Sequence, residues 1–226
     1  MGIPERRERE RQQRRRAILE AAQRVFFQHG YRNATMEMVA AEAELGKATL
    51  YEYFHTKEEL YVALLEDGLR LFDAMMAQAS QEAAQQPVRQ AIHTFARQYW
   101  RFANEYPEYF VLLMHVSTAI ELPLEKVRSE LLAELQQLQE RAVLRGMELV
   151  QRGIQEGIFP PGVVPGRVLA EFWVVLSGAL LLARHPYRMR LMQEVKPEEL
   201  VEELVELLLC GWQCRAQSSL VSSSPR

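Results

Sequence analysis

Apolar residues return every three or four positions along almost the whole sequence, and this period constrains the fold more than any other feature. Such spacing places apolar side chains on one side of an α-helix, whereas a half-buried strand alternates apolar and polar residues. No convincing alternating stretch is present. The sequence therefore predicts an all-α protein. We expect helices from within the arginine run to about residue 29, then over about 36–43, 47–54, 57–84, 87–105, 107–119, 124–157, 165–184 and 197–215.

Residues that favour helix ends define the first four helices. Gly30 follows His29 and can take the left-handed conformation that ends a helix. Thr35 is a suitable N-cap for the second helix. Thr56 followed by Glu59 predicts a capping box at the start of the fourth helix.

The charge of the chain is unevenly distributed. The net charge of -3 excludes a uniformly basic protein, yet residues 1–16 contain seven arginines against three glutamates. No apolar run follows these arginines, so this segment is not a secretory signal and we expect a cytoplasmic protein. The longest apolar run, residues 168–183, contains Glu171 and is short for a membrane span, which favours a buried helix and no membrane partner.

The residues that usually support catalysis or metal binding are scattered. Cys210 and Cys214 have no neighbouring histidine, so they make a poor metal site and suit a reduced, packed pair. The five histidines are not clustered, and no glycine-rich phosphate loop is present. We therefore expect no enzyme activity, no catalytic residues, no metal site and no cofactor.

The stretch LGKATLYEYFHTKEEL, residues 45–60, contains the third of three short helices, after a tight turn at residues 44–46. This is the layout of a helix-turn-helix unit, in which the third helix reads DNA. Leu50 and Phe54 share the inner face of that helix. The remaining side chains can reach base edges or phosphate oxygens: Lys47, Thr49, Tyr51 and Tyr53. Ordinary packing of a tyrosine-rich helix is the alternative.

Residues 16–60 resemble the N-terminal domain of the TetR family of bacterial transcriptional regulators. The likeness is carried, without a gap, by Ala21-Ala22, Phe26, Gly30, Thr35, Val39-Ala40, Ala43, Lys47, Thr49-Leu50-Tyr51, Tyr53-Phe54 and Lys57-Glu58-Glu59-Leu60. The resemblance implies that DNA is contacted by Thr35, Gly46, Lys47, Ala48, Thr49, Tyr51, Tyr53 and Lys57. Lys47 and Thr49 are expected at base edges. The family usually has glycine in the turn and serine as the cap, where this chain has Glu44 and Gly46, so we expect an altered operator preference.

The same resemblance implies the organisation of the whole chain. We expect a basic arm at 1–11, a DNA-binding domain at 12–72 with its helix-turn-helix at about 35–54, and a helical effector-binding and dimerisation domain at 73–216. The serine-rich composition predicts a disordered tail at 217–226. A homodimer would bind a palindromic double-stranded operator, most simply as a repressor. Its interface is expected at Phe172, Leu176, Leu180, Leu204, Leu208 and Trp212.

Aromatic, methionine and histidine side chains gather on the middle helices and predict a pocket for a small hydrophobic effector. The candidates are Phe72, Met75, Phe95, Tyr99, Trp100, Phe110, Met114, His115 and Trp173, and for each of them a place in a filled core is the alternative. The alternative function is a helical carrier or sensor of hydrophobic ligands that does not bind DNA. Such a carrier would leave the tyrosine and lysine side chains of residues 47–53 unexplained.

Overall fold

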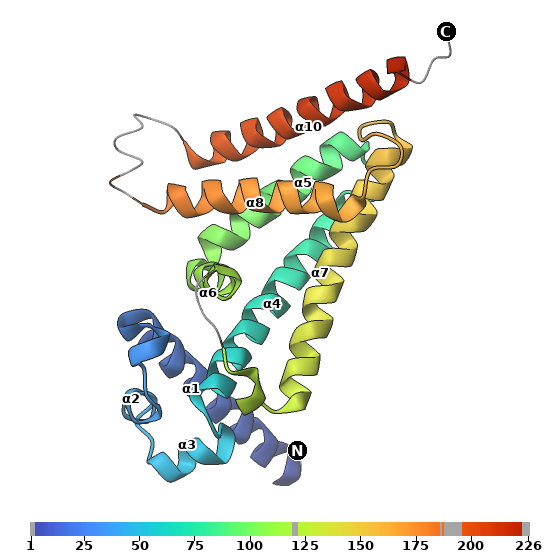
Figure 1. Ribbon diagram of the computed structural model, residues 1–226. Helices are drawn as coiled ribbons and strands as arrows, with labels where there is room; N and C mark the ends of the chain where they lie inside the picture. Colours follow the sequence, from blue (N-terminus) through green and yellow to red (C-terminus); the bar gives the residue numbers. More distant parts are fainter. Residues whose placement is uncertain (1–2, 119–121, 186, 188–195, 223–226) are drawn as a thin grey trace. The chain divides into compact units, whose positions relative to one another are not determined.

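The computed structural model describes residues 3–118, 122–185, 187 and 196–222. Within these ranges the chain is helical and contains no strand, which confirms the all-α prediction. The elements are α1 (Ile3–Asn33), α2 (Met36–Glu42), α3 (Lys47–Tyr53), α4 (Lys57–Glu82), α5 (Val88–Glu105), α6 (Pro107–Thr118), the 3-10 turn η1 (Leu124–Lys126), α7 (Ser129–Gln155), α8 (Pro165–Ala183) and α10 (Pro197–Ser222) (Figure 1).

The chain forms two compact units. The first comprises residues 1–69 and 112–137, and the second comprises residues 70–111 and 138–226. Helices α4, α6 and α7 each begin in one unit and end in the other.

The first unit has its core between α1 and its neighbours. The predicted apolar stripe of α1 is buried: Ile18, Ala21, Ala22, Val25 and Phe26. Phe26 of α1 meets Tyr61 of α4 edge to face, with ring centroids 5.3 Å apart. Tyr31 completes the cluster at 5.0 Å from the Tyr61 ring. Edge-to-face pairs of this kind contribute about 0.5–1.5 kcal/mol each beyond the area that they bury.

Helix α1 begins at Ile3, well before the expected start within the arginine run. Ion pairs one turn apart support this exposed first part, for example Arg6 with Glu10 at 2.9 Å and Arg16 with Glu20 at 3.1 Å. The glutamates between the arginines thus turn a basic segment into a charged helix. The predicted stop is found at Gly30, whose φ of 74° lies in the left-handed region that favours glycine.

Two other helix boundaries differ from the sequence-based expectation. Leu124–Lys126 forms a 3-10 turn and Val127 is extended, so the long helix α7 begins only at Ser129. Helix α10 continues to Ser222, past the predicted start of a disordered tail at residue 217. Residues 223–226 and most of the predicted polar loop at 185–196 lie outside the described residues.

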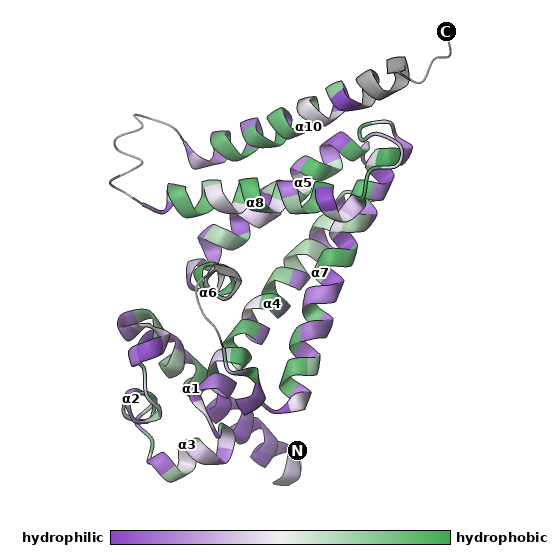
Figure 2. Cartoon of the chain, in the orientation of Figure 1, coloured by the Kyte–Doolittle hydropathy of each residue, from purple (hydrophilic) through white to green (hydrophobic). Residues whose placement is uncertain are grey.

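In the second unit α10 packs against both α5 and α8, and α5 also packs against α8. Figure 2 shows that α8 is largely hydrophobic, whereas α10 alternates between hydrophobic and hydrophilic positions. The buried residues include Val88, Ala91 and Ile92 of α5, Val168 and Leu180 of α8, and Val201, Val205, Leu209 and Trp212 of α10.

Helix α8 starts at Pro165, so it is longer than the apolar run noted in the sequence. With 19 residues and a mean hydropathy of 1.6 over its most apolar window, it is long and apolar enough to cross a membrane. Core helices of soluble proteins meet the same test, but only 22% of that window is buried within this chain. The helix therefore presents an apolar surface that needs a cover.

Candidate nucleic-acid interface and internal cavity

The turn between α2 and α3 follows from the residues at the two ends of α2. At the start, the Thr35 hydroxyl accepts a hydrogen bond from the Met38 amide at 3.2 Å, which is the predicted N-cap. At the end, the amides of Glu44 and Leu45 donate to the carbonyls of Ala41 and Ala40, at 3.1 and 2.9 Å. This double closure is a Schellman motif, and it requires Glu44 to adopt a φ of 55°. The turn lies where the sequence predicted it.

Helix α3 buries one face and leaves the other accessible. Leu50 and Phe54 are buried, as the spacing predicted. Tyr51 is 41% exposed. Most of the predicted DNA-contacting residues therefore share an accessible surface at the starts of α2 and α3: Thr35, Gly46, Lys47, Ala48 and Tyr51 are exposed, while Thr49 and Tyr53 are half-buried.

Lys47 links the starts of the two helices. Its ammonium group lies 3.0 Å from a carboxylate oxygen of Glu37, and both side chains are exposed. The hydrogen bond from Lys47 lowers the pKa of the Glu37 carboxyl below its usual 4.5. Because water competes for both groups, the pair stabilises the fold little and holds Lys47 weakly. Lys47 can therefore exchange Glu37 for a phosphate or a base edge.

Lys57 lies in a different environment from the other predicted contacts. Its ammonium group donates to the backbone carbonyls of Tyr31, Arg32 and Ala34 at 2.9, 3.3 and 3.2 Å. It also lies 4.6 Å from the centroid of the Tyr31 ring. An ammonium group has three donors, and all three serve the end of α1. Local spacing in the sequence could not show this role, because the carbonyls belong to a different helix.

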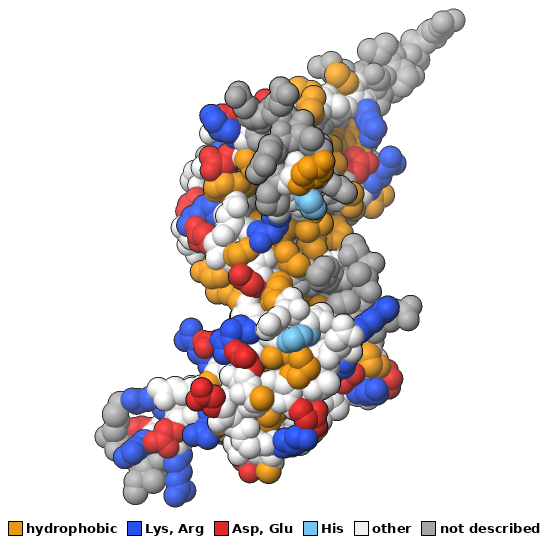
Figure 3. Space-filling model, turned by 90° about the vertical axis from the view of Figure 1, so that its left-hand side faces the viewer, with side chains coloured by type: hydrophobic (Ala, Val, Ile, Leu, Met, Phe, Trp, Pro, Cys, Tyr) orange, Lys and Arg blue, Asp and Glu red, His pale blue; other side chains and the backbone are white. Residues whose placement is uncertain are grey.

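The basic arm runs along α3 as the first part of α1. Arg7, Arg11 and Arg14 line a groove with Tyr53 at the end of α3, together with Glu10 and Glu52. The guanidinium of Arg15 lies 5.6 Å from the centroid of the Phe54 ring. In Figure 3 basic and acidic side chains alternate along the projecting N-terminal segment. The arm thus adds cations beside the helix that the sequence assigned to DNA reading.

A buried carboxylate holds the corner between α3 and α4. Glu59 is 1% exposed. Its carboxylate accepts from the His55 amide at 2.9 Å and from Arg128 Nε at 2.8 Å. Its own amide donates to the Thr56 hydroxyl at 3.1 Å. The predicted capping box is therefore present, with the returning hydrogen bond taken from His55 in place of Thr56.

The second unit contains a cavity of about 140 Å³. Four of the predicted pocket residues line it: Phe72, Phe95, Tyr99 and Trp173. Met75, Trp100, Phe110 and Met114 do not line it, and the side chain of His115 lies outside those described. The other lining residues are Met76, Ile92, Ala96, Ala142, Arg145, Gly146, Leu149, Val150, Phe159, Leu169, Phe172 and Leu176.

Packing between helices decided which aromatic residues reach the cavity. Phe110 is fully buried and stacks edge to face on Tyr99, with centroids 5.9 Å apart, so it supports the cavity wall from behind. On α7, a Cβ atom at Gly146 would lie 2.5 Å from Leu169 Cδ1, and one at Gly153 would lie 2.4 Å from Phe159 Cδ2. The two glycines therefore let Leu169 and Phe159 approach α7 and narrow the cavity.

Two polar pairs adjoin this apolar space. The hydroxyls of Tyr99 and Ser177 lie 2.6 Å apart and are buried, and burial raises the pKa of Tyr99 to about 12. Arg145 of α7 pairs with Asp73 of α4, with Nη2 at 3.1 Å from Oδ1. Both phenol and serine are neutral at physiological pH, so Arg145 is the only charged side chain among the described lining residues.

The predicted dimer-interface residues divide into two groups. Leu176, Leu180 and Trp212 are buried within their own chain, and Leu176 and Phe172 line the cavity. Phe172, Leu204 and Leu208 are half-buried. The most exposed large apolar residues on the same helices are Trp173, Val174 and Leu181 of α8 and Leu207 of α10. The helices are thus those expected, and the exposed face is rotated from the listed positions.

An all-helical chain with a capped helix-turn-helix, an accessible lysine and tyrosine on its second helix and an arginine-rich arm beside it defines a helix-turn-helix DNA-binding protein. Residues 18–64 match the family model of the bacterial regulatory proteins, tetR family. The chain belongs to the TetR family of bacterial transcriptional regulators.

Individual relatives agree with this assignment. The uncharacterized HTH-type transcriptional regulator YhgD of Bacillus subtilis is 50% identical over 48 residues, which are 21% of this chain and 25% of that protein. The HTH-type transcriptional activator FasR of Mycolicibacterium smegmatis is 32% identical over 115 residues, which are 51% of this chain and 47% of that protein. The matches therefore span half or less of the length of these two relatives.

A solved structure shows the likeness of the fold over most of the chain. The structure of AibR in complex with isovaleryl coenzyme A and operator DNA has a TM-score of 0.68 at 20% sequence identity. The comparison covers 87% of this chain and 98% of that one. It supports the same helical architecture beyond the region of clear sequence similarity.

Proposed function

We propose that this protein regulates transcription in the cytoplasm by binding a palindromic double-stranded operator as a homodimer, most simply as a repressor that a small hydrophobic effector releases. The observation that carries the proposal is the accessible surface of Thr35, Lys47, Thr49, Tyr51 and Tyr53, with an arginine arm along its edge. Lysine, hydroxyl groups and arginines of this kind bind phosphates and base edges.

Lys47 and Thr49 would read base edges, while Thr35 and Tyr51 would hold phosphates. The backbone at Gly46 and Ala48 would approach the duplex closely. We no longer assign Lys57 a first role in DNA contact, because its ammonium group already serves three carbonyls of the α1 end. It would act by holding α1 in place beside the reading helix.

A second copy of the chain is the proposed cover for the exposed apolar residues of α8 and α10. Val174 and Leu207 are 61% and 68% exposed, and Trp173 and Leu181 lie on the same two helices. Two such pairs of helices would form a four-helix bundle across a two-fold axis. The dimer would place two reading helices roughly 34–36 Å apart, one turn of DNA, which suits a palindrome.

The cavity supports the effector part of the proposal. It is almost entirely apolar, and α4, which contributes Phe72 and Met76 to its wall, begins in the unit that carries the helix-turn-helix. An effector that binds better to one arrangement of α4 than to another would shift the dimer between two shapes, and this differential affinity is sufficient for regulation. The structure of the relative AibR contains both a coenzyme A thioester and operator DNA.

A gel shift on the DNA upstream of the gene, repeated over a range of salt concentrations, tests DNA binding. We expect a specific shift that weakens steeply with salt. Lys47→Ala and Tyr51→Phe should weaken it without lowering the melting temperature. Lys196→Ala and Tyr187→Phe are matched controls, because Lys196 forms a similar exposed pair with Glu199 and Tyr187 is exposed. A carrier that does not bind DNA would show no shift with any of these proteins.

A further inference from the structure

Arg145 brings the only charge into a cavity wall that is otherwise formed by apolar and aromatic side chains among the described residues. Its Nε and Nη2 atoms both donate to the same oxygen of Asp73, at 3.2 and 3.1 Å. Charge-assisted hydrogen bonds are usually about 2.7–2.9 Å long, so this pair is loosely held. No hydrogen bond to Nη1 is formed by the described residues.

The guanidinium therefore keeps donors for another acceptor. Its side chain retains 27% of its exposure, whereas that of Asp73 retains 15%. A guanidinium presents its N–H groups as a planar fork, which matches the two oxygens of a carboxylate or phosphate. An anionic group inside the cavity would thus find a partner at Arg145, and the remaining walls would receive only apolar parts of a ligand.

We infer that the cavity selects an apolar ligand with one anionic end, and that this end binds Arg145 in competition with Asp73. The inference rests on the proposed function, in which the effector occupies this cavity. A volume of about 140 Å³ is similar to that of an engineered cavity that holds benzene, so the apolar part is a single ring or a short chain.

The same contact offers a route for regulation. Asp73 belongs to α4 and Arg145 to α7, so their ion pair ties these two helices together within the second unit. An acidic ligand that takes over the guanidinium weakens this tie, whereas a neutral ligand of the same shape leaves it intact. Ligand choice and the response of α4 would then depend on one residue.

Phenylacetate and its neutral analogue 2-phenylethanol test the inference by calorimetric titration of the full-length protein. We expect wild type to bind phenylacetate about tenfold or more tightly than 2-phenylethanol, as a hydrogen-bonded charge requires. Arg145→Gln should remove this preference and leave 2-phenylethanol binding unchanged. Asp73→Asn, which removes the competitor, should strengthen phenylacetate binding. Arg101→Gln, on an exposed pair of α5, should change neither ligand.

Phenylacetyl coenzyme A distinguishes the two sources of an anionic end. Should the thioester bind more tightly than the free acid and lose that advantage in Arg145→Gln, the anion at Arg145 is a phosphate of the coenzyme. If Arg145→Gln proves unstable, Asp73→Asn/Arg145→Gln supplies the same comparison without an unpaired charge. An unchanged preference in these variants, or no binding of any of the three ligands, overturns the inference. The proposed function fails separately, when the unliganded protein gives no gel shift.

Discussion

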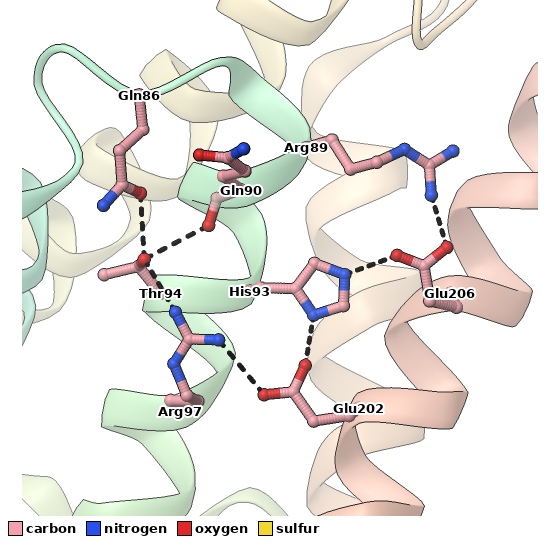
Figure 4. A network of polar contacts seen from close by, with 8 residues as sticks. All are labelled: Gln86, Arg89, Gln90, His93, Thr94, Arg97, Glu202 and Glu206. Atoms are coloured by element: carbon pink, nitrogen blue, oxygen red, sulfur yellow. Dashed lines mark hydrogen bonds and ion pairs between the residues drawn. The ribbon is translucent and has the colours of Figure 1, made fainter.

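The Nε2 atom of His93 on α5 lies 2.6 Å from Oε1 of Glu206 on α10. The other ring nitrogen faces Glu202, so the imidazole stands between two carboxylates (Figure 4). Arg89 pairs with Glu206 and Arg97 with Glu202, which completes a network between the two helices. Only a doubly protonated ring can donate to both carboxylates. The junction of α5 and α10 is therefore held by matched charges around one histidine.

We predict an acid-sensitive contribution of Glu206 to stability. The hydrogen bond from His93, with further help from Arg89 and against the effect of burial, lowers the pKa of the Glu206 carboxyl below its usual 4.5. A carboxyl with a lowered pKa stabilises the fold above its unfolded pKa and loses that effect as the pH falls through its folded pKa. The free energy of unfolding of wild type should exceed that of Glu206→Gln near neutral pH.

This difference should shrink once the pH falls below about 4.5, and chemical denaturation at several pH values measures it. Glu203→Gln, an exposed glutamate of the same helix, is the control and should show no such dependence. A difference between wild type and Glu206→Gln that stays constant from neutral to acidic pH would contradict the prediction.

Lys57 and Lys47 should respond in opposite ways to the same substitution. Lys57→Met removes the donors from three carbonyls at the end of α1 and should destabilise the protein by about 2 kcal/mol, as expected for hydrogen bonds to a charged group. Lys47→Met removes only an exposed pair and should leave the melting temperature near that of wild type while weakening DNA binding. Thermal melts beside gel shifts check both, and equal melting temperatures for the two variants would refute the distinction.

Glu44 occupies a conformation better suited to glycine. Its φ of 55° lies in the left-handed region, which costs an ordinary L-residue about 1–2 kcal/mol. Glu44→Gly should therefore stabilise the protein by about 1 kcal/mol, after allowing for the greater flexibility of unfolded glycine. Glu44→Ala keeps the Cβ atom and serves as the control. A gain in melting temperature for alanine equal to that for glycine would attribute the effect to the lost charge.

The exposed apolar face of α8 and α10 should control the oligomeric state. Leu207→Glu places a charge on a residue that makes few contacts within its own chain, so the protomer should remain folded while the dimer dissociates. Sedimentation velocity measures the mass. Leu144→Glu, at a residue of α7 with similar exposure, is the control and should stay dimeric. Leu207→Glu that sediments like wild type would place the interface elsewhere.

Short-range features of the sequence determined much of the DNA-binding half. The Thr35 cap, the Gly30 stop, the turn at Glu44 and the inner face of Leu50 and Phe54 are all found in the structure. Each depends on residues within about one or two helical turns, where geometry follows from backbone hydrogen bonds and the helical period. The sequence by itself therefore determined the all-α class, the helix-turn-helix and its accessible surface.

Tertiary structure alone decided which distant side chains meet. It assigned Lys57 to the end of α1, placed Arg145 beside Asp73, and kept Phe110 behind the cavity. These relationships depend on how each helix rotates about its axis when it packs, and one position along a helix turns the side chain by about 100°. A periodic pattern gives the apolar side of a helix, but only packing against particular neighbours determines which of those residues line a cavity.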